Sequence, residues 1–281
     1  MEIVRRVRGM REVSRQARAA GRRIGFVPTM GFLHEGHMSL VRRVREVSDL
    51  VVVSIFVNPT QFGPGEDFER YPRDLAADAD LCIARGVDYV FVPESREIYP
   101  HGASTFVEVE GLSSRLEGRS RPGHFRGVAS VVLKLFEVVA PHVAAFGQKD
   151  AQQVAVLRRM VRDLLVDTEI LVAPIVRDSD GLALSSRNVY LSVEEKGAAL
   201  AIPRALAAAE AAVASGVRDP ARILRAAREV LEAEPLLRVD YLEIVDPDEF
   251  VTVDTVEREV LLAAAVFAGA TRLIDNTVLR A

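Results

Sequence analysis

The sequence predicts an α/β protein with a doubly wound parallel sheet, followed by a smaller α+β unit. Through the first 176 residues, short apolar runs bounded by turn residues alternate with amphipathic helical patterns. After about Arg177 the pattern changes to alanine-rich helical segments followed by three strand-like runs. Apolar residues make up 49% of the 281 and charged residues 27%, which provides for a packed interior and excludes intrinsic disorder. We therefore expect two domains, residues 1–176 and residues 177–281.

Five runs of the first domain have the composition of strands that are buried on both faces. Each is a short stretch of mainly apolar or β-branched residues, as in a parallel sheet whose faces are covered by helices. They are Ile24–Pro28, Leu50–Val57, Tyr89–Pro93, Val143–Phe146 and Glu169–Val176. Their alternation with helices predicts a Rossmann-like sheet that binds its ligands at the carboxyl ends of the strands.

Amphipathic helices are expected between these strands. The segments are Met38–Val47, Leu75–Arg85, Val128–Val139 and Asp150–Leu164. In the last of them, apolar residues recur at spacings of three and four, which places them on one helical stripe. We expect Asp78 and Asp80 on a solvated helix face. The alternating residues of Ser104–Glu110 predict a short accessory strand.

The second domain is expected to combine two helices with an antiparallel sheet. Ala198–Ser215 and Pro220–Ala233 are helical by composition, and Asp219 directly before a proline is a typical N-cap. Three strand-like runs follow, with Gly269 as a turn residue after the second of them. They are Val239–Val245, Glu259–Phe267 and Arg272–Leu279. Helices followed by neighbouring strands favour an α+β unit.

Composition and charge exclude several classes of function. With 40 acidic and 36 basic residues the net charge is −4, so nothing calls for nucleic acid or an anionic membrane as a partner. The apolar run Val260–Ala270 is too short to cross a bilayer, and the first residues contain no apolar signal core. The single cysteine, Cys82, excludes a disulfide framework, so we expect a cytoplasmic protein. Only three basic residues are lysines, which makes Lys134, Lys149 and Lys196 conspicuous.

Two histidines follow the first buried strand, where the chain enters a helix. Gly31 and Gly36 let the backbone approach a ligand closely, and a helix N-terminus presents N–H groups to an anion. His34 and His37 lie on one face if the helix begins at His34. This arrangement suits a polyphosphate on which charge grows during a reaction. The alternative is that the histidines cap the helix or pack. A metal site is disfavoured because the spacing is not that of His-Glu-x-x-His.

Three further polar segments follow strands or lie near the domain boundary. Gln61 carries both a donor and an acceptor, which suits a hydroxyl beside a carboxylate. Gly147–Asp150 follows a buried strand and opens a helix, with Lys149 as a point charge and Asp150 as a plausible N-cap. Leu184–Arg187 offers two hydroxyls and a guanidinium, which can clamp a phosphate. On the residues alone, ordinary solvated surface is the favoured interpretation of Gln61 and of Leu184–Arg187, whereas the two interpretations of Gly147–Asp150 are balanced.

The segment Pro28–Leu40 resembles the His-x-Gly-His signature of the nucleotidyltransferase superfamily, in the version found in the pantoate–β-alanine ligase family. Five further segments are similar to that family in the expected order, along nearly the whole chain. They are Phe56–Phe62, Tyr71–Arg73, Arg121–Val128, Phe146–Gln153 and Gly181–Asn188. A lone His-x-Gly-His is shared by many adenylyl-transferring enzymes, whereas the whole set is specific. The sequence contains neither a Walker phosphate-binding motif nor a Gly-x-Gly-x-x-Gly fingerprint.

The resemblance implies an enzyme that condenses pantoate with β-alanine through a pantoyl adenylate, releasing AMP and pyrophosphate. ATP is then a substrate that arrives with Mg²⁺, no tightly bound cofactor or protein-bound metal is implied, and the expected assembly is a homodimer. The C-terminal domain would act as a lid that carries the Ser-Ser-Arg loop. Leu184 departs from the family, which often has Met there, but this exchange nearly conserves volume.

The resemblance also implies roles for individual residues. His37 would donate a proton, with His34 and Lys149 as further catalytic residues. Gln61 would bind pantoate and β-alanine, and Gln153 would bind pantoate. The residues implied in ATP binding are Met30, Gly31, Phe32, Leu33, His34, Glu35, Gly36, His37, Gly147, Gln148, Lys149, Asp150, Val176, Leu184, Ser185, Ser186 and Arg187.

Two other functions stay open on the residues alone. Another nucleotidyltransferase would use a phosphorylated acceptor, although Gln61 and Gln153 favour an uncharged polar or carboxylate acceptor. A non-catalytic nucleotide sensor would close on ATP and signal through a partner. His124 and Arg126, in a basic loop with glycines around them, fit a substrate gate and a subunit contact equally well.

Overall fold

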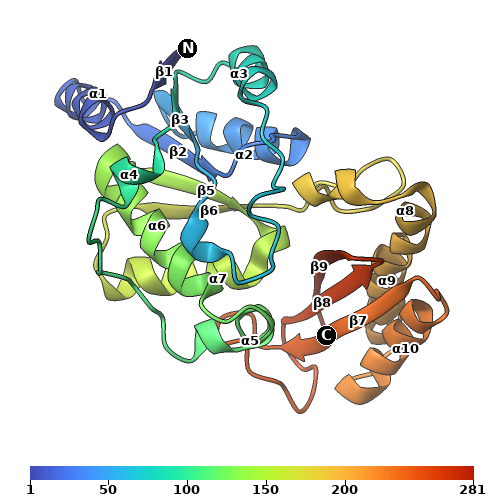
Figure 1. Cartoon of the computed structure of the whole chain (residues 1–281). Coiled ribbons are helices and arrows are strands. Elements are labelled where there is room, and N and C mark those ends of the chain that lie inside the picture. The colour runs from blue at the N-terminus through green and yellow to red at the C-terminus, as the bar shows by residue number, and fades with distance from the viewer. The chain divides into compact units, whose positions relative to one another are not determined.

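The computed structural model describes residues 1–281, which divide into two compact units (Figure 1). The N-terminal unit consists of Met1–Gly147 and Val156–Pro174, and the C-terminal unit of Gln148–Ala155 and Ile175–Ala281. The division expected from the sequence, after residue 176, differs from this one mainly in residues 148–155. That segment packs with the C-terminal unit, although it follows a strand of the N-terminal sheet.

The N-terminal unit contains a six-stranded parallel sheet, with strands in the order β1-β4-β3-β2-β5-β6. All five predicted strands form in it, so the predicted doubly wound sheet is confirmed; β1 and α1 were not predicted. The elements in chain order, up to the last strand of this sheet, are β1 Glu2–Val4, α1 Val7–Ala19, β2 Ile24–Thr29, α2 Glu35–Arg45, β3 Leu50–Ile55, η1 Pro59–Gln61, α3 Leu75–Ala84, β4 Tyr89–Phe91, α4 Ser95–Ile98, η2 Leu112–Ser114, α5 Leu116–Ser120, α6 His124–Val139, β5 Val143–Gly147, η3 Gln148–Asp150, α7 Ala151–Asp163 and β6 Glu169–Ala173.

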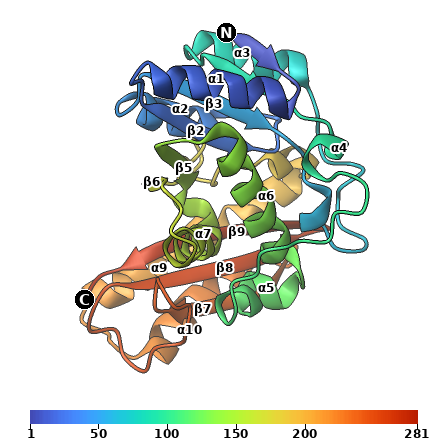
Figure 2. The same cartoon turned by 90° about the vertical axis from the view of Figure 1, so that its left-hand side faces the viewer.

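Alternate residues of β2 pack against helices on opposite faces of the sheet, and Figure 2 shows α2 and α6 beside β2. Phe26 packs edge-on against Phe136 of α6, with ring centres 6.3 Å apart. Val27, the next residue, belongs to a core cluster with side chains of α2. Gly25 faces α2 too, and a Cβ there would lie 2.0 Å from Cγ1 of Val44. Because both faces are covered, β2 and β3 are mainly apolar rather than alternating. The expectation that Glu169–Val176 is buried on both faces is wrong, because β6 lies at the edge of the sheet, with Glu169 exposed and residues 170–172 half-buried.

The prediction of an accessory strand at Ser104–Glu110 is wrong. No strand pairs with this segment, which runs in irregular conformation. The N–H of Val107 donates instead to Oγ of Ser130 on α6, at 2.8 Å. A helix side chain thus satisfies a backbone group that a sheet partner would have bonded.

The C-terminal unit places helices against an antiparallel sheet of order β7-β8-β9, which confirms the predicted α+β arrangement. Asp219 caps α10 by accepting the N–H of Ala221 at 2.9 Å, and Gly269 makes the turn after β8 at φ +56°. The elements are η4 Ser186–Tyr190, α8 Val193–Ala199, α9 Ala201–Ala214, α10 Pro220–Glu232, β7 Leu237–Val245, β8 Val260–Ala268 and β9 Thr271–Leu279.

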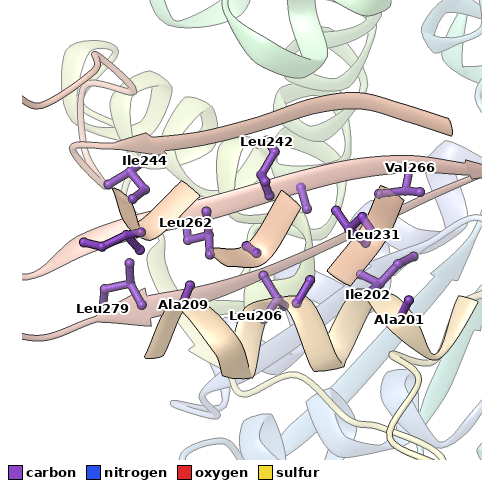
Figure 3. Packing of buried hydrophobic residues seen from close by; sticks show 14 of the residues in the cluster. Ala201, Ile202, Leu206, Ala209, Leu231, Leu242, Ile244, Leu262, Val266 and Leu279 are labelled. Carbon is purple, nitrogen blue, oxygen red and sulfur yellow. The ribbon is translucent and has the colours of Figure 1, made fainter. Parts of the chain in front are cut away.

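The core of the C-terminal unit lies between α9, α10 and the sheet. Ile202 and Leu206 of α9 pack there with Leu262 of β8 and Leu279 of β9 (Figure 3). By length and composition alone, the helical run Val193–Ala214 is apolar enough to cross a membrane, and it is the one such run in the chain. Its buried alanine and leucine side chains belong to this core, which explains its apolar composition without a bilayer.

Candidate active site

The chain leaves β2 at Thr29 and enters α2 through a tight loop that ends at the two predicted histidines. His34 is the N-cap of α2, and its Nδ1 accepts the N–H of Gly36 at 3.1 Å. Nδ1 of His37 accepts the N–H of His34 at 3.3 Å. The two ring centres lie 4.1 Å apart. The helix therefore begins at Glu35, three residues before the start expected from the apolar pattern, and the two histidines form a reciprocal cap.

These bonds determine which ring nitrogen of each histidine carries the proton. A backbone N–H can only donate, so each Nδ1 is an acceptor and the neutral ring has its hydrogen on Nε2. Both imidazoles therefore carry Nε2–H donors beside a helix N-terminus, where N–H groups and the helix dipole favour an anion. Capping and anion binding use different nitrogens of the same ring, so the two interpretations of the histidines are compatible.

A buried carboxylate holds the loop between β2 and α2. Asp78 of α3 accepts the N–H groups of Phe32 at 2.9 Å and Leu33 at 2.6 Å, and it is 2% exposed. Gly31 and Phe32 both have positive φ, +84° and +50°. A Cβ at Gly31 would lie 2.9 Å from Cγ2 of Ile55 and 3.0 Å from Oδ2 of Asp78. Conformation and space together therefore require glycine at position 31.

The prediction that Asp78 lies on a solvated helix face is wrong, whereas Asp80 is exposed as expected. Leu75, Asp78 and Cys82 recur at spacings of three and four, so the periodicity of the sequence already places Asp78 on an apolar stripe. Burial raises the pKa of the Asp78 carboxyl, although two backbone bonds favour its ionised form. Burial, with Asp78 nearby, also raises the pKa of the Cys82 thiol to about 12.

The carboxylate of Glu35 is engaged with arginines. It pairs with Arg42 at 2.5 Å and with Arg85 at 2.8 Å, and the hydrogen bond from Arg42 is the largest cause that lowers its pKa. Glu35 is exposed on the first turn of α2. The predicted contact between Glu35 and ATP would therefore use the backbone N–H of Glu35 rather than its side chain.

Gln61 lies at the end of η1, against the loop that follows β2. Its Nε2 is 3.0 Å from Sδ of Met30, and its Oε1 accepts Nδ2 of Asn58 at 3.1 Å. Asn58 is 1% exposed, donates to the carbonyl of Gly127 at 3.1 Å and accepts the hydroxyl of Tyr99 at 2.8 Å. Gln61 itself is 8% exposed, so it is not a solvated turn residue. Asn58, which orients its amide, was not predicted.

The basic loop before α6 reaches the backbone of Gln61. Nδ1 of His124 lies 2.9 Å from the Gln61 carbonyl, and a guanidinium nitrogen of Arg121 lies 3.2 Å from Nε2 of His124. Because a carbonyl only accepts and a guanidinium only donates, the hydrogen of His124 is on Nδ1. Arg121 also binds Glu66 at 2.7 and 2.8 Å; burial opposes ionisation of Glu66, but this pairing lowers its pKa overall. Arg126 is exposed.

In the C-terminal unit, the predicted lysine lies in the 3₁₀ turn η3 directly before α7. The carbonyls of Gln148 and Lys149 both accept Nδ2 of Asn276, at 3.0 Å. Nε2 of Gln148 donates to Oδ1 of Asn276 at 3.2 Å. The ammonium of Lys149 forms no ion pair, whereas the other two lysines bind a backbone carbonyl and a pair of carboxylates. Lys149 therefore keeps its charge available for a ligand.

Gly147 ends β5 before this turn, and Asp150 closes the turn at the start of α7. A Cβ on Gly147 would meet no atom within 4 Å, so no close approach within the chain requires glycine there. Gln153, one turn into α7, is half-buried. The roles of these three residues toward a ligand stay predictions.

A small hairpin leads into the Ser-Ser-Arg loop. Arg177 pairs with Ala183 across it, and the N–H of Leu184 donates to the carbonyl of Val176 at 2.9 Å. The guanidinium of Arg177 binds both carboxylate oxygens of Asp275, at 2.6 and 3.1 Å. The hairpin is thus attached to β9, which lies about a hundred residues later in the chain.

The loop itself begins η4. Ser185 is its N-cap and accepts the N–H of Arg187 at 3.3 Å. Ser186 is 7% exposed, and Arg187 is half-buried. This loop is therefore packed rather than ordinary solvated surface.

The residues that sequence reasoning missed are all buried polar side chains, each bonded to a predicted residue, to its backbone or, for Asp275, to Arg177 of the hairpin before the Ser-Ser-Arg loop. The apolar helix stripe around Asp78 is a signal that could have found that residue, whereas the others have no signal in the local sequence. The missed residues are Asn58, Asp78, Asp275 and Asn276.

A parallel sheet of this kind, with anion-binding groups after its strands, is the architecture of α/β nucleotide-binding proteins. The family model of pantoate-beta-alanine ligase matches residues 2–278. The pantothenate synthetase of Acidobacterium capsulatum is 61% identical over 258 residues, which cover 92% of this chain and 86% of that protein. The chain therefore belongs to the pantoate–β-alanine ligase family.

Solved structures agree with this assignment over the full length. The pantothenate synthetase of Thermus thermophilus is 48% identical, has a TM-score of 0.93, and 99% of each chain is covered. The pantoate-beta-alanine ligase of Francisella tularensis, complexed with beta-gamma ATP and beta-alanine, is 33% identical with a TM-score of 0.80, covering 99% of this chain and 97% of that one. The ligase prediction is confirmed, and these matches support neither a nucleotidyltransferase with a phosphorylated acceptor nor a nucleotide sensor.

Proposed function

We propose that the chain condenses (R)-pantoate with β-alanine in two steps that share one ATP-derived intermediate. In the first step, a carboxylate oxygen of pantoate attacks the α-phosphorus of ATP, the bond from that phosphorus to the bridging oxygen breaks, and pyrophosphate leaves. In the second step, the amine of β-alanine attacks the acyl carbon of pantoyl adenylate, the carbon–oxygen bond to AMP breaks, and the nitrogen loses a proton. Pantothenate, AMP and pyrophosphate are the products.

The observation that carries this proposal is the reciprocal cap of His34 and His37. Both rings have Nε2–H donors at the end of a buried strand and at the start of a helix. Charge accumulates on the leaving pyrophosphate during the first step, and donors that are already oriented stabilise it without reorganising. His37 is the proposed proton donor, and His34 binds phosphate beside it.

The fixed positive charges come from the C-terminal unit. Lys149 is held by its backbone, and its ammonium has no competing carboxylate. Ser185, Ser186 and Arg187 add hydroxyl and guanidinium donors for the phosphates. In the proposed reaction both sets act on one ATP, with backbone contacts from Met30–Gly36 and Gly147–Asp150, and with Val176 and Leu184 near the adenosine. Mg²⁺ arrives with ATP and is bound mainly by its phosphates.

The acceptor carboxylate and hydroxyls are recognised by amides. Oε1 of Gln61 accepts Nδ2 of Asn58, and one hydrogen of Nε2 points to Sδ of Met30, so the second hydrogen of Nε2 is the proposed donor to a substrate. An N–H group can donate to the carboxylates of pantoate and β-alanine, and it can also donate to a hydroxyl oxygen of pantoate. Gln153 has the corresponding role for pantoate on α7.

Three further features belong to the same proposal: a lid domain, a homodimer and a cytoplasmic location. The C-terminal domain, residues 177–281 in the sequence-based division, acts as a lid on the N-terminal domain, because a hydrolysable acyl adenylate needs protection from water. The protein is a homodimer in the cytoplasm. Light scattering after gel filtration, on the purified chain, measures the number of subunits; a monomeric mass contradicts the homodimer.

The reaction is tested by mixing protein, Mg²⁺, ATP and pantoate, first without and then with β-alanine. We expect one equivalent of pyrophosphate per site without β-alanine, and release of AMP with pantothenate only after β-alanine is added. A single-turnover experiment without any pyrophosphate before β-alanine contradicts the adenylate route. AMP release that does not require pantoate contradicts the ligase reaction itself.

A further inference from the structure

Two consecutive residues of β9 hold the turn that carries Lys149 and the hairpin that leads into the Ser-Ser-Arg loop. β9 is an edge strand, paired to β8 with Asp275 opposite Ala264 and Asn276 opposite Ala263. Because successive side chains of a strand point to opposite faces, Asp275 shares the face of the core residue Leu273 and Asn276 points the other way. Both are buried, at 3% and 4% exposure.

Asp275 holds the hairpin before the Ser-Ser-Arg loop. Its carboxylate accepts two bonds from Arg177, and the same guanidinium donates to the carbonyl of Gly181 at 3.1 Å. A bidentate pair constrains both distance and orientation. Since Arg177 is bridged to Ala183, the pair also locates the strand of the hairpin that leads into Ser185.

Asn276 holds the turn that carries Lys149. Its amide donates to two successive carbonyls and accepts from the side chain of Gln148, so one side chain fixes the backbone of η3. The N–H of Asn276 donates to Oδ1 of Asp275 at 2.8 Å. The two segments, far apart in sequence, are thus attached to one dipeptide on opposite faces of one strand.

We propose that Asp275 and Asn276 are positioning residues of this ligase, which set the separation between Lys149 and the Ser185–Arg187 loop so that both bind the same triphosphate. The inference rests on the proposed function, because it assumes that these segments bind ATP. Neither residue contacts the nucleotide; each acts through a segment that does. A displacement of about 1 Å in such groups is enough to lower turnover by about two orders of magnitude.

The test is a double-mutant cycle on kcat for pyrophosphate release with pantoate and β-alanine present. Asn276→Asp keeps the side-chain shape but replaces an amide donor with an oxygen that repels the carbonyls of η3. We expect roughly a 10- to 100-fold loss of kcat with Lys149 present. We expect no more than about a twofold further loss in Lys149→Ala, because the turn then carries no charge to misplace. If Asn276 has only a structural role, Asn276→Asp lowers kcat by the same factor in the wild-type protein and in the Lys149→Ala protein.

A matched control breaks another arginine–carboxylate pair on the same strand. Arg272 of β9 binds Asp240 at 2.7 and 3.0 Å and contacts neither predicted segment. Asp240 is exposed whereas Asp275 is buried, so Asp240→Asn should lower the melting temperature less than Asp275→Asn and leave kcat within about twofold, whereas Asp275→Asn should lower kcat by roughly tenfold or more. Asn276→Ser, which introduces no charge, replaces Asn276→Asp if the latter does not fold.

The outcomes separate the inference from the function on which it rests. A loss at Asn276 that nearly disappears in the Lys149→Ala background supports the positioning role. A kcat within twofold of wild type in the folded Asn276 variant, or an undiminished factor in the Lys149→Ala background, overturns the inference and leaves the proposed function intact. Near-normal kcat in Lys149→Ala alone overturns the assignment of Lys149 to ATP, and the inference with it.

Discussion

The two units hold their predicted anion-binding groups in different ways. In the N-terminal unit, the imidazoles of His34 and His37 are oriented by bonds within one turn of α2, and Asp78 holds the loop before them. In the C-terminal unit, Lys149 and the Ser-Ser-Arg hairpin are held by side chains of β9, 127 and 98 residues away in sequence. The first unit presents neutral N–H donors, and the second presents fixed positive charges.

The two arrangements differ in how much of the fold must form before the anion-binding groups are held in place. A cap whose partners lie two or three residues apart forms as soon as the helix forms, with little loss of chain entropy. A turn held from a distant strand is ordered only when the sheet has assembled. The two imidazoles are therefore oriented by a local motif, with one distant support from Asp78 to the loop before them, whereas the C-terminal groups depend on the packing of their whole unit.

The largest expected effect tests the chemistry of both units. His37→Ala removes an Nε2–H donor and Lys149→Ala removes a charge; each is expected to lower kcat by about 100-fold or more, since both act on the developing charge. Steady-state pyrophosphate release measures this. His101 is exposed in a loop, so His101→Ala is the control and should leave kcat within about twofold. Near-normal turnover in either site variant contradicts the assignment for that unit.

The next effect probes the buried carboxylate of the N-terminal unit, Asp78. Asp78→Ala leaves two buried N–H groups of the loop without an acceptor, so the free energy of unfolding should fall by about 1–3 kcal/mol. kcat should fall roughly tenfold because the loop loses its position. Urea denaturation and turnover on the same preparation measure both. Asp80→Ala, on the exposed side of the same helix, should change stability by less than about 0.5 kcal/mol; equal effects of the two variants would refute the role of Asp78.

A pair of glycines then compares the two strand ends directly. Gly31→Ala forces a Cβ into a position with φ +84° and a contact of 2.9 Å, so it should lower the free energy of unfolding by about 1–3 kcal/mol. Gly147→Ala enters open space at ordinary φ and should cost less than about 0.5 kcal/mol. The urea concentrations at the midpoints of unfolding of the two variants measure this difference in stability. Equal destabilisation would mean that the two loops are not constrained differently.

The smallest expected effect concerns the thiol of Cys82, which lies one helical turn after Asp78 on α3. Because burial raises the pKa of Cys82 to about 12, native protein at pH 8 should react with iodoacetamide only after unfolding in urea. The stability that comes from the protonated thiol is fully present below the ordinary thiol pKa of 9.0 and is lost as pH rises from there towards about 12. Rapid alkylation of folded protein would show that α3 opens readily and that Asp78 is not held in a rigid stripe.

Much of the fold was predictable because its signals are local. Continuous apolar runs marked β2 to β6, and Asp219 before Pro220 marked the start of α10. The alternating pattern of Ser104–Glu110 predicted a strand, but no neighbouring strand pairs with this segment. Alternation is only a propensity, and a strand exists only where another strand lies beside it.

The candidate site was predictable to a similar extent. The motif residues were found by their spacing and by family resemblance, but their supports were not. Asn58, Asp275 and Asn276 carry no local signature, because their partners are defined by packing rather than by sequence spacing.

Local patterns in the sequence were enough to predict most strands and helices in their order, the two histidines at the start of a helix, and membership in a family with a known order of motifs. These depend on side-chain periodicity and on backbone constraints that act over a few residues. The tertiary structure was needed to show that Asp78 accepts two N–H groups of the loop before α2, that both Nδ1 atoms of the histidine pair accept bonds, and that β9 holds two distant loops. Those facts depend on burial and on hydrogen bonds between residues far apart in the chain, which no local pattern specifies.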